Sequence, residues 1–305
     1  MVRTSSKWGW LLLAMIAATP AQASLRIFAC EPEWGALARE LMPEATIDVA
    51  TSAYQDPHFV QARPSLIAKV RQADLAVCTG AELEVGWLPA LLLKANNKAL
   101  TPTGQGLFYA ADQVDKLDVM VHVDRSMGDV HAGGNPHIHL SPQRVLQVAE
   151  ALAQRLQQLA PADRAAIGSR LADFRQRWQT AMARWQQQGQ PLKGMRLVAY
   201  HSSYRYLFDW LGIEQVGDLE PKPGLPPTSG HLASLLAQLK SQPPQAVVHT
   251  PYQQAQAAEW LSSQLQVPVL ALPYTIDDAA VTDLFALYDQ LLAALGLLAV
   301  SHAAG

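Results

Sequence analysis

The sequence is poor in charge, in cysteine and in long apolar runs. Charged residues make up 16% of the 305 residues and the formal net charge is −3, so the basic excess that binds nucleic acid is missing. The apolar run at residues 8–18 is shorter than the roughly 20 residues that a membrane-spanning helix needs. Hydrophobic residues nevertheless make up 50% of the chain, which is ample for two buried cores. We therefore expect a globular protein that binds no nucleic acid.

The first residues have the features of a secretory signal peptide. Arg3 and Lys7 precede the apolar run, and the small-residue tripeptide A-Q-A at residues 21–23 follows it. We therefore expect residues 1–23 to be a signal peptide that is cut after Ala23. Its removal takes away two basic residues and leaves a net charge of 21 − 26 = −5. No cysteine closely follows the apolar run, so we expect a periplasmic protein without a lipid anchor.

The sequence contains only two cysteines, Cys30 and Cys78. An oxidising compartment permits them to form a disulfide. Two buried free thiols are the alternative, because unpaired cysteine is among the most frequently buried residues. Composition alone leaves both alternatives open.

Short apolar strands alternate with amphipathic helices in two stretches of the chain, which predicts parallel sheets covered on both faces. Between the stretches, apolar residues recur every three or four positions from 163 to 188 without a proline. This pattern predicts a helix of about 26 residues, close to 40 Å long. We therefore predict an α/β protein with two lobes joined by one long rigid helix, the last helix of the chain covering about residues 279–298. The predicted lobes are residues 24–160 and 191–305, and the connecting helix lies within 161–190.

Several potential metal ligands are expected in loops beside the ends of predicted strands, where functional groups collect in open α/β sheets. They are four histidines and two aspartates: His58, His137, His201, His249, Asp277 and Asp278. Imidazole is the commonest protein ligand for a transition metal, but most histidines are surface or hydrogen-bonded core residues. An aspartate at the start of a helix often only caps it. Spacing therefore leaves open whether these side chains converge on a metal.

Four stretches resemble the solute-binding proteins of zinc and manganese ABC transporters. The region from "DPHFVQARPS" to "GAELEVGWLPALL" resembles the family's succession D-P-H, R-P-S and G-x-x-L-E…W-L, and "GNPHIHLSP" resembles its G-N-P-H-x-W-L-D-P loop. "AYHSSYRYLFDWLGI" resembles its segment with a histidine after a strand, and "PKPGLPPTSGHLASLLAQLK" its P-G-x-x-P-(S/T) stretch. The four motifs occur in the family's order over most of residues 25–295. The sequence is identified as a member of this family.

The resemblance implies two Rossmann-like lobes that hold one metal ion in the cleft between them. It also implies delivery of that ion to the membrane permease of an ABC transporter, by a protein that we expect to be monomeric. Carried over by position, the ligands are His58, His137 and His201. The fourth ligand should be a carboxylate in the loop before the last helix, and Asp278 is favoured over Asp277.

Three imidazoles and one carboxylate make a tetrahedral site that suits Zn²⁺. Manganese prefers more oxygen ligands, and manganese-binding members of the family usually have Glu where His201 stands, so we expect zinc as the transported ion and manganese as the alternative. An exported zinc hydrolase is a further alternative. A catalytic zinc keeps one position open for water, however, and four protein ligands would close it. The sequence also lacks an H-E-x-x-H motif, so we expect no enzymatic activity.

Some residues depart from the family pattern. His139 stands where the family often has Trp, and in an extended segment its side chain points away from that of His137. We predict that it supports the site from outside the ligand set. Glu31 and Glu33 follow the first predicted strand, where the family generally has no such acids. They are predicted either to accept a hydrogen bond from a ligating imidazole or simply to begin a helix.

The segment "VHVDRSMGDVHAGG" is shorter than the histidine-rich loop of many zinc-binding members. Its potential donors are His122, Asp129 and His131. They predict either a weak accessory metal site or a solvated loop that binds no metal. The resemblance also bears on the cysteines. In sheets of this family the first and third strands are neighbours, which would bring Cys30 and Cys78 to adjacent strand ends and favours the disulfide.

Overall fold

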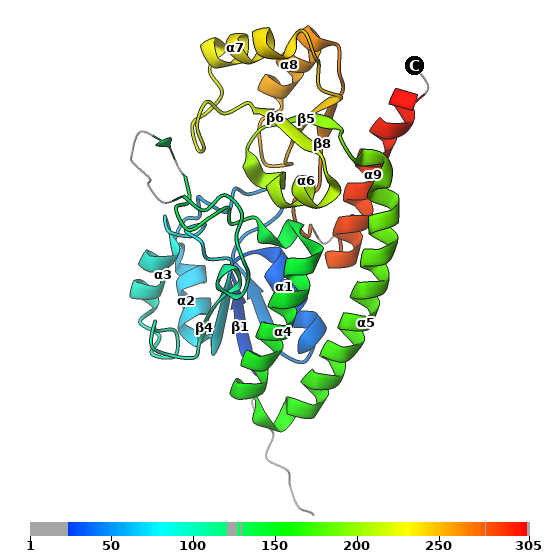
Figure 1. The fold of residues 1–305 in the computed structure, drawn as a ribbon. Helices are drawn as coiled ribbons and strands as arrows, with labels where there is room; N and C mark the ends of the chain where they lie inside the picture. The colour runs from blue at the N-terminus through cyan, green and yellow to red at the C-terminus, as the bar shows by residue number, and fades with distance from the viewer. Residues whose placement is uncertain (1–23, 121–126, 129, 278, 304–305) are drawn as a thin grey trace, which may run out of the picture.

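The computed structural model describes residues 24–120, 127–128, 130–277 and 279–303. They form two four-stranded parallel sheets with helices packed around each (Figure 1). The strand orders are β2-β1-β3-β4 and β6-β5-β7-β8, so the two lobes repeat one topology. The predicted α/β architecture is confirmed. No helix in these described ranges is long and apolar enough to cross a membrane. The predicted signal peptide lies outside them.

In the first sheet the two central strands are almost wholly buried, as expected for strands covered on both faces, and the two edge strands are partly exposed. Its strands are β1 (Arg26–Ala29), β2 (Thr46–Val49), β3 (Leu75–Cys78) and β4 (Leu107–Tyr109). The helices around it are α1 (Pro32–Leu41), α2 (Pro64–Gln72), α3 (Leu88–Ala95) and α4 (Pro142–Leu159). Proline opens α1, α2 and α4, because its fixed φ suits the first turn of a helix and its missing N–H is not needed there.

The second sheet follows the same plan. Its strands are β5 (Arg196–Ala199), β6 (Glu214–Asp218), β7 (Ala246–His249) and β8 (Val269–Ala271). Its helices are α6 (Arg205–Leu211), α7 (Ser229–Leu239) and α8 (Gln256–Leu265). Short 3₁₀ helices connect elements in both lobes: η1 (Ala110–Gln113), η3 (Ile138–Leu140), η4 (Pro161–Asp163), η5 (Gln190–Leu192) and η6 (Ser202–Tyr204). Gly212 ends α6 in the left-handed conformation, at φ 68°, which glycine adopts without strain.

A 26-residue helix, α5 (Arg164–Gly189), joins the two lobes, and its predicted length is confirmed. It runs beside the last helix, α9 (Leu284–Ala303), as Figure 1 shows. Aromatic rings fill the contact between the two helices. Trp178 packs edge-on against Trp185 with ring centroids 5.0 Å apart, and Trp185 stacks on Tyr288 at 4.8 Å. All three side chains are fully buried, so α5 and α9 are tightly packed against each other.

The start of the last helix was predicted wrongly. The helix begins at Leu284 and not near residue 279. The Asp277 carboxylate accepts hydrogen bonds from the backbone N–H groups of residues 279, 280 and 281, which closes a separate turn. Asp283 then accepts from the backbone N–H of Ala286 and caps α9. Two capping aspartates therefore divide a stretch that the sequence pattern treats as one helix.

Cys30 and Cys78 form a disulfide. They follow the paired residues Ala29 and Val77 at the carboxyl ends of the neighbouring strands β1 and β3. Both are buried. The predicted pairing is confirmed, and the alternative of two free thiols is wrong.

Candidate metal centre

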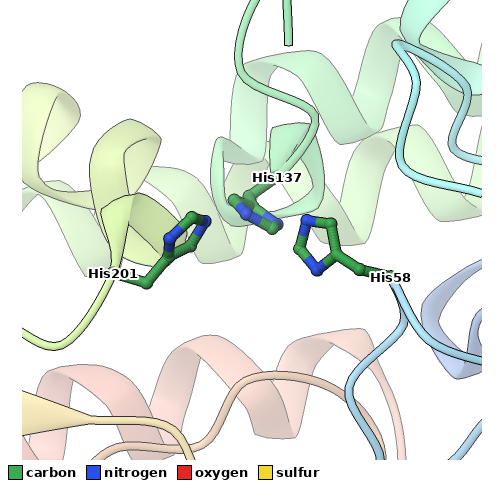
Figure 2. Close-up of side chains that lie close together, drawn as sticks. All are labelled: His58, His137 and His201. Atoms are coloured by element: carbon green, nitrogen blue, oxygen red, sulfur yellow. The ribbon is translucent and has the colours of Figure 1, made fainter. Parts of the chain in front are cut away.

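Three histidines from distant parts of the chain meet between the lobes (Figure 2). His58 follows β2 in the first lobe, His137 lies directly before η3, and His201 lies two residues after β5 in the second lobe. One nitrogen of each ring lies within 4.8 Å of a nitrogen of each of the others. The ring centroids are 5.5 to 5.8 Å apart. The structure thus brings together the three histidines that the sequence singled out.

Local hydrogen bonds fix the backbone that presents His58. The Asp56 carboxylate accepts from the backbone N–H of His58 at 3.0 Å, which closes a tight turn across Pro57. The indole N–H of Trp87 donates to the Pro57 carbonyl at 2.9 Å. The D-P-H motif therefore holds the histidine rigidly against the first lobe.

A similar turn presents His137. The side-chain oxygen of Asn135 accepts from the His137 backbone N–H at 3.0 Å. The Asn135 amide nitrogen donates to the Ser202 carbonyl at 3.0 Å, next to His201. Asn135 therefore links the loop that carries His137 to the segment of the second lobe that carries His201.

Each of the three rings is oriented by a hydrogen bond at Nδ1. The partners are the Asp56 carboxylate for His58 (2.7 Å), the Tyr274 hydroxyl for His137 (2.7 Å) and the Glu220 carboxylate for His201 (2.8 Å). An ionised carboxylate only accepts, so Nδ1 of His58 and of His201 carries the proton. In the neutral rings the lone pair is then on Nε2, the arrangement found in metal-binding histidines whose other nitrogen is hydrogen-bonded to a carboxylate.

Two of these Nε2 atoms have no partner among the described residues. Nε2 of His137 and Nε2 of His201 are both buried and make no hydrogen bond. An unsatisfied buried polar atom costs about 1–3 kcal/mol, so such atoms are rare unless they serve a ligand. Two unpartnered ring nitrogens that converge in one buried place fit a metal cation.

The protonation of the site also favours a cation. Burial and the nearby rings of His201 and His58 hold the pKa of His137 well below the usual 6.5. Burial alone would raise the pKa of Asp56, but its hydrogen bonds and charge interaction with His58 lower it overall. At neutral pH the site therefore combines the neutral imidazole of His137 with the negative carboxylate of Asp56, which is hydrogen-bonded to His58.

His139, Glu31 and Glu33, which were predicted to support the site, make their described hydrogen bonds away from the three clustered rings. His139 is buried but separate from the three rings: its Nε2 donates to the Tyr274 carbonyl at 2.9 Å, and its Nδ1 lies 3.2 Å from the Glu33 carboxylate. Glu31 accepts hydrogen bonds from the backbone and hydroxyl of Thr79. Burial, and next the charge of Glu84, raise the pKa of Glu31 well above its usual range. The hydrogen bonds described for Glu31 and Glu33 do not reach the three clustered histidines.

The predicted fourth ligand is not placed, because Asp278 lies outside the described residues, as do His122 and Asp129. Asp277 is described, and its carboxylate is occupied by three backbone N–H groups. The hydrogen bond from the N–H of Val281 is the largest cause that lowers the pKa of Asp277. Asp277 therefore acts as a cap in this structure.

His131 lies beside the three-histidine site, in contact with His58, and not in a solvated loop away from it. Its ring stacks on that of His58, and the two Nε2 atoms are 3.2 Å apart. Burial, followed by the nearby rings of His58 and His201, lowers the pKa of His131 to about 3.

Sequence reasoning missed the three groups that orient the rings: Asp56, Glu220 and Tyr274. Asp56 has a signal, because an aspartate two residues before a histidine readily closes a turn onto it. Glu220 lies two residues after β6, in a Pro/Gly loop that has no pattern of its own. Tyr274 meets His137 across 137 residues of sequence, so only the folded chain reveals the contact.

Comparison with known proteins supports a metal-related role. Residues 27–295 match the family model described as zinc-uptake complex component A, periplasmic (ZnuA). The chain is 26% identical over 195 residues to the high-affinity zinc uptake system protein ZnuA of Yersinia pestis, a match that covers 60% of this chain and 61% of that relative. The chain therefore spans less than two thirds of that relative's length.

Two solved structures share the fold. A crystal structure of ZnuA has a TM-score of 0.75 at 21% identity, covering 91% of this chain and 98% of that one. A Mn-bound S38A mutant of the periplasmic metal-binding protein from candidatus liberibacter asiaticus has a TM-score of 0.71 at 15% identity, covering 90% and 98%. These three matched proteins are named for metal binding or zinc uptake, and none is named as an enzyme.

Proposed function

Since the chain belongs to the periplasmic zinc-uptake complex component A family, we propose that it captures Zn²⁺ and delivers it to the permease of an ABC importer. The proposed ligands are Nε2 of His58, His137 and His201, with the Asp278 carboxylate as the predicted fourth. The observation that carries the proposal is the convergence of these rings, because two of them hold buried Nε2 atoms that have no partner among the described residues.

Zinc is preferred over manganese on the chemistry of the donors. The three side chains that converge offer imidazole nitrogen, which suits a borderline-soft cation such as Zn²⁺. Manganese suits carboxylate and carbonyl oxygen better. The carboxylates of Asp56 and Glu220 are engaged at Nδ1 of the rings, so they act on the metal through the histidines.

Capture would join the two lobes through the ion. His58 belongs to the first lobe and His201 to the second, so one Zn²⁺ bound to both links them directly. The aromatic packing between α5 and α9 is already dense, which favours a small adjustment over a large hinge motion. The permease would then recognise the surface formed by both lobes and their loops.

The location follows from the same proposal. Arg3 and Lys7, the apolar run and the A-Q-A tripeptide favour export with cleavage after Ala23. A periplasmic protein of this kind would bind the ion outside the inner membrane. The energy for transport would come from the partner's ATPase.

The test is a zinc titration of the full chain against a competing chromophoric chelator. The double variant His58→Ala/His201→Ala should lose high-affinity binding, because it removes one proposed ligand from each lobe. His231→Ala is a matched control, since the His231 ring is engaged with the Asp218 carbonyl at 2.8 Å. Elemental analysis of protein purified from its own compartment should find zinc in excess of manganese. Wild-type affinity in the double variant would refute the proposed site.

A further inference from the structure

A buried carboxyl group of the first lobe contacts the segment that follows β8 in the second lobe. Glu33, on α1, is fully buried, and its Oε2 accepts a hydrogen bond from the Thr275 hydroxyl. Its other oxygen, Oε1, lies 3.2 Å from Nδ1 of His139, which is also buried. Resting on the zinc function proposed above, we propose that Glu33 is a positioning residue, which holds Tyr274 where its hydroxyl orients the zinc ligand His137.

Glu33 and His139 hold the chain on both sides of one peptide bond. Glu33 accepts from the side chain of Thr275, and Nε2 of His139 donates to the Tyr274 carbonyl at 2.9 Å. The His139 ring also packs edge-on against the Tyr274 ring, with centroids 4.9 Å apart. Because Glu33 and His139 contact each other as well, these four residues form a closed ring of contacts, which we call the clamp.

The same segment is fixed to the second lobe where it leaves β8. The backbone N–H of Leu272 donates to the His249 carbonyl at 3.0 Å, and the Tyr204 hydroxyl donates to the Leu272 carbonyl at 2.6 Å. Tyr274 therefore lies between an anchor on the second lobe and the clamp, whose residues Glu33 and His139 belong to the first lobe. Its position depends on both lobes.

The position of the Tyr274 oxygen matters for the metal because it meets Nδ1 of His137 at 2.7 Å. A neutral imidazole carries one proton, so the His137 ring presents a lone pair at Nε2 only while Nδ1 carries that proton and donates it. The Tyr274 oxygen accepts it there. A shift of the Tyr274 backbone would move this oxygen and disturb the ring orientation that zinc requires.

Stability is a poor reason for a carboxyl group in this place. Taking a carboxyl group out of water is costly, and replacing a buried ionic pair by apolar side chains of similar volume is often neutral or stabilising. Buried polar groups do, however, fix one arrangement of the chain, because their hydrogen bonds are directional. The clamp fixes the segment that carries Tyr274, which is why we assign Glu33 a role in metal binding.

The first test compares variants in the zinc titration against a chromophoric chelator. Thr275→Val removes the hydroxyl that Glu33 holds but keeps the shape of the side chain, and Glu33→Ala removes both contacts of the carboxyl group. Each should weaken zinc binding about tenfold, the lower end of the effect of losing a partner behind a metal ligand. Glu33→Gln keeps an oxygen that can accept from Thr275, so it should bind zinc more tightly than Glu33→Ala. Glu40→Ala, on the same helix, removes an ion pair with Arg177 and should match the wild type.

The second test reads the His137 ring, which a general loss of stability would not change in the folded protein. Long-range ¹H–¹⁵N spectra of the metal-free full chain, labelled with ¹⁵N-histidine, report which ring nitrogen carries the proton. In Thr275→Val the His137 nitrogens should shift more than those of His58 and His201, whose Nδ1 partners are carboxylates outside the clamp. Thr275→Val keeps both tests decisive if Glu33→Ala does not fold.

The outcomes separate this inference from the proposed function. Wild-type zinc affinity in Thr275→Val, or a loss of affinity with an unshifted His137 ring, would overturn the clamp and leave zinc capture standing. An equal loss in Glu40→Ala would also overturn it, because α1 would then act through its packing alone. Wild-type affinity in His58→Ala/His201→Ala would overturn zinc capture itself. A tenfold loss together with a His137 shift in Thr275→Val supports the clamp.

Discussion

Removing the carboxylate behind His201 should weaken zinc binding strongly, although that carboxylate is not a proposed ligand. The Oε2 atom of Glu220 accepts from Nδ1 of His201 at 2.8 Å and from the backbone N–H of Gly224 at 3.1 Å. Both side chains of this hydrogen-bonded pair are largely buried, at 9% and 12% exposed, so water replaces the contact poorly. Losing a partner of this kind costs about 10–100-fold in metal affinity, or roughly 1.4–2.8 kcal/mol.

Two substitutions separate the charge from the hydrogen bond. In Glu220→Gln the amide oxygen can still accept from both donors, so only the charge is lost and we expect a fall near tenfold. In Glu220→Ala the ring also loses the bond that fixes its tautomer, and we expect a fall nearer a hundredfold. Competition with a chromophoric chelator at pH 7.5 measures both. Glu214→Gln, an exposed carboxylate on β6, is the control. Wild-type affinity in Glu220→Ala would refute the idea that this contact tunes the ligand.

Three further predictions concern neighbouring features. The double variant Cys30→Ala/Cys78→Ala should lose about 2–4 kcal/mol of unfolding free energy in denaturant titrations, because the bond closes a loop with a sequence separation of 48; unchanged stability would contradict this. Asp277→Ala should lose about 1 kcal/mol of stability as a missing cap yet bind zinc normally, and a large loss of zinc affinity would make it a ligand. Burial raises the pKa of Glu84 to about 7, so the folded state favours the protonated form of this side chain. The free energy of unfolding that protonated Glu84 contributes is therefore lost as the pH rises from about 4.5 to 7. The melting temperature of metal-free Glu84→Gln should therefore rise relative to wild type across that interval, and a flat difference would count against the raised pKa.

The regular parts of the fold could be predicted because their patterns are local. An unbroken three-to-four spacing gave the length of α5, and strands without polar residues indicated parallel sheets. The start of α9 could not be predicted in the same way. The Asp277 side chain competes for backbone N–H groups, and that competition is decided by how the chain turns before the helix.

Only those site residues that stand in recognisable sequence motifs could be predicted. His58, His137 and His201 stand in recognisable motifs, and the structure places their rings together. Tyr274 and Glu220 act through contacts that depend on the packing of both lobes, and no spacing in the sequence records them. The position of His131 likewise depends on folded contacts, such as the hydrogen bond from the N–H of Ala132 to the Glu82 carboxylate, which the sequence does not record.

The central claim is that the Nε2 atoms of the clustered histidines hold one zinc ion between the lobes. The most direct test is a crystal structure of the zinc-loaded full chain, with anomalous diffraction recorded on both sides of the zinc absorption edge. The account predicts one strong peak between the lobes, about 2.0–2.1 Å from Nε2 of His58, of His137 and of His201. A peak elsewhere, or no zinc-specific signal at these three atoms, would contradict it.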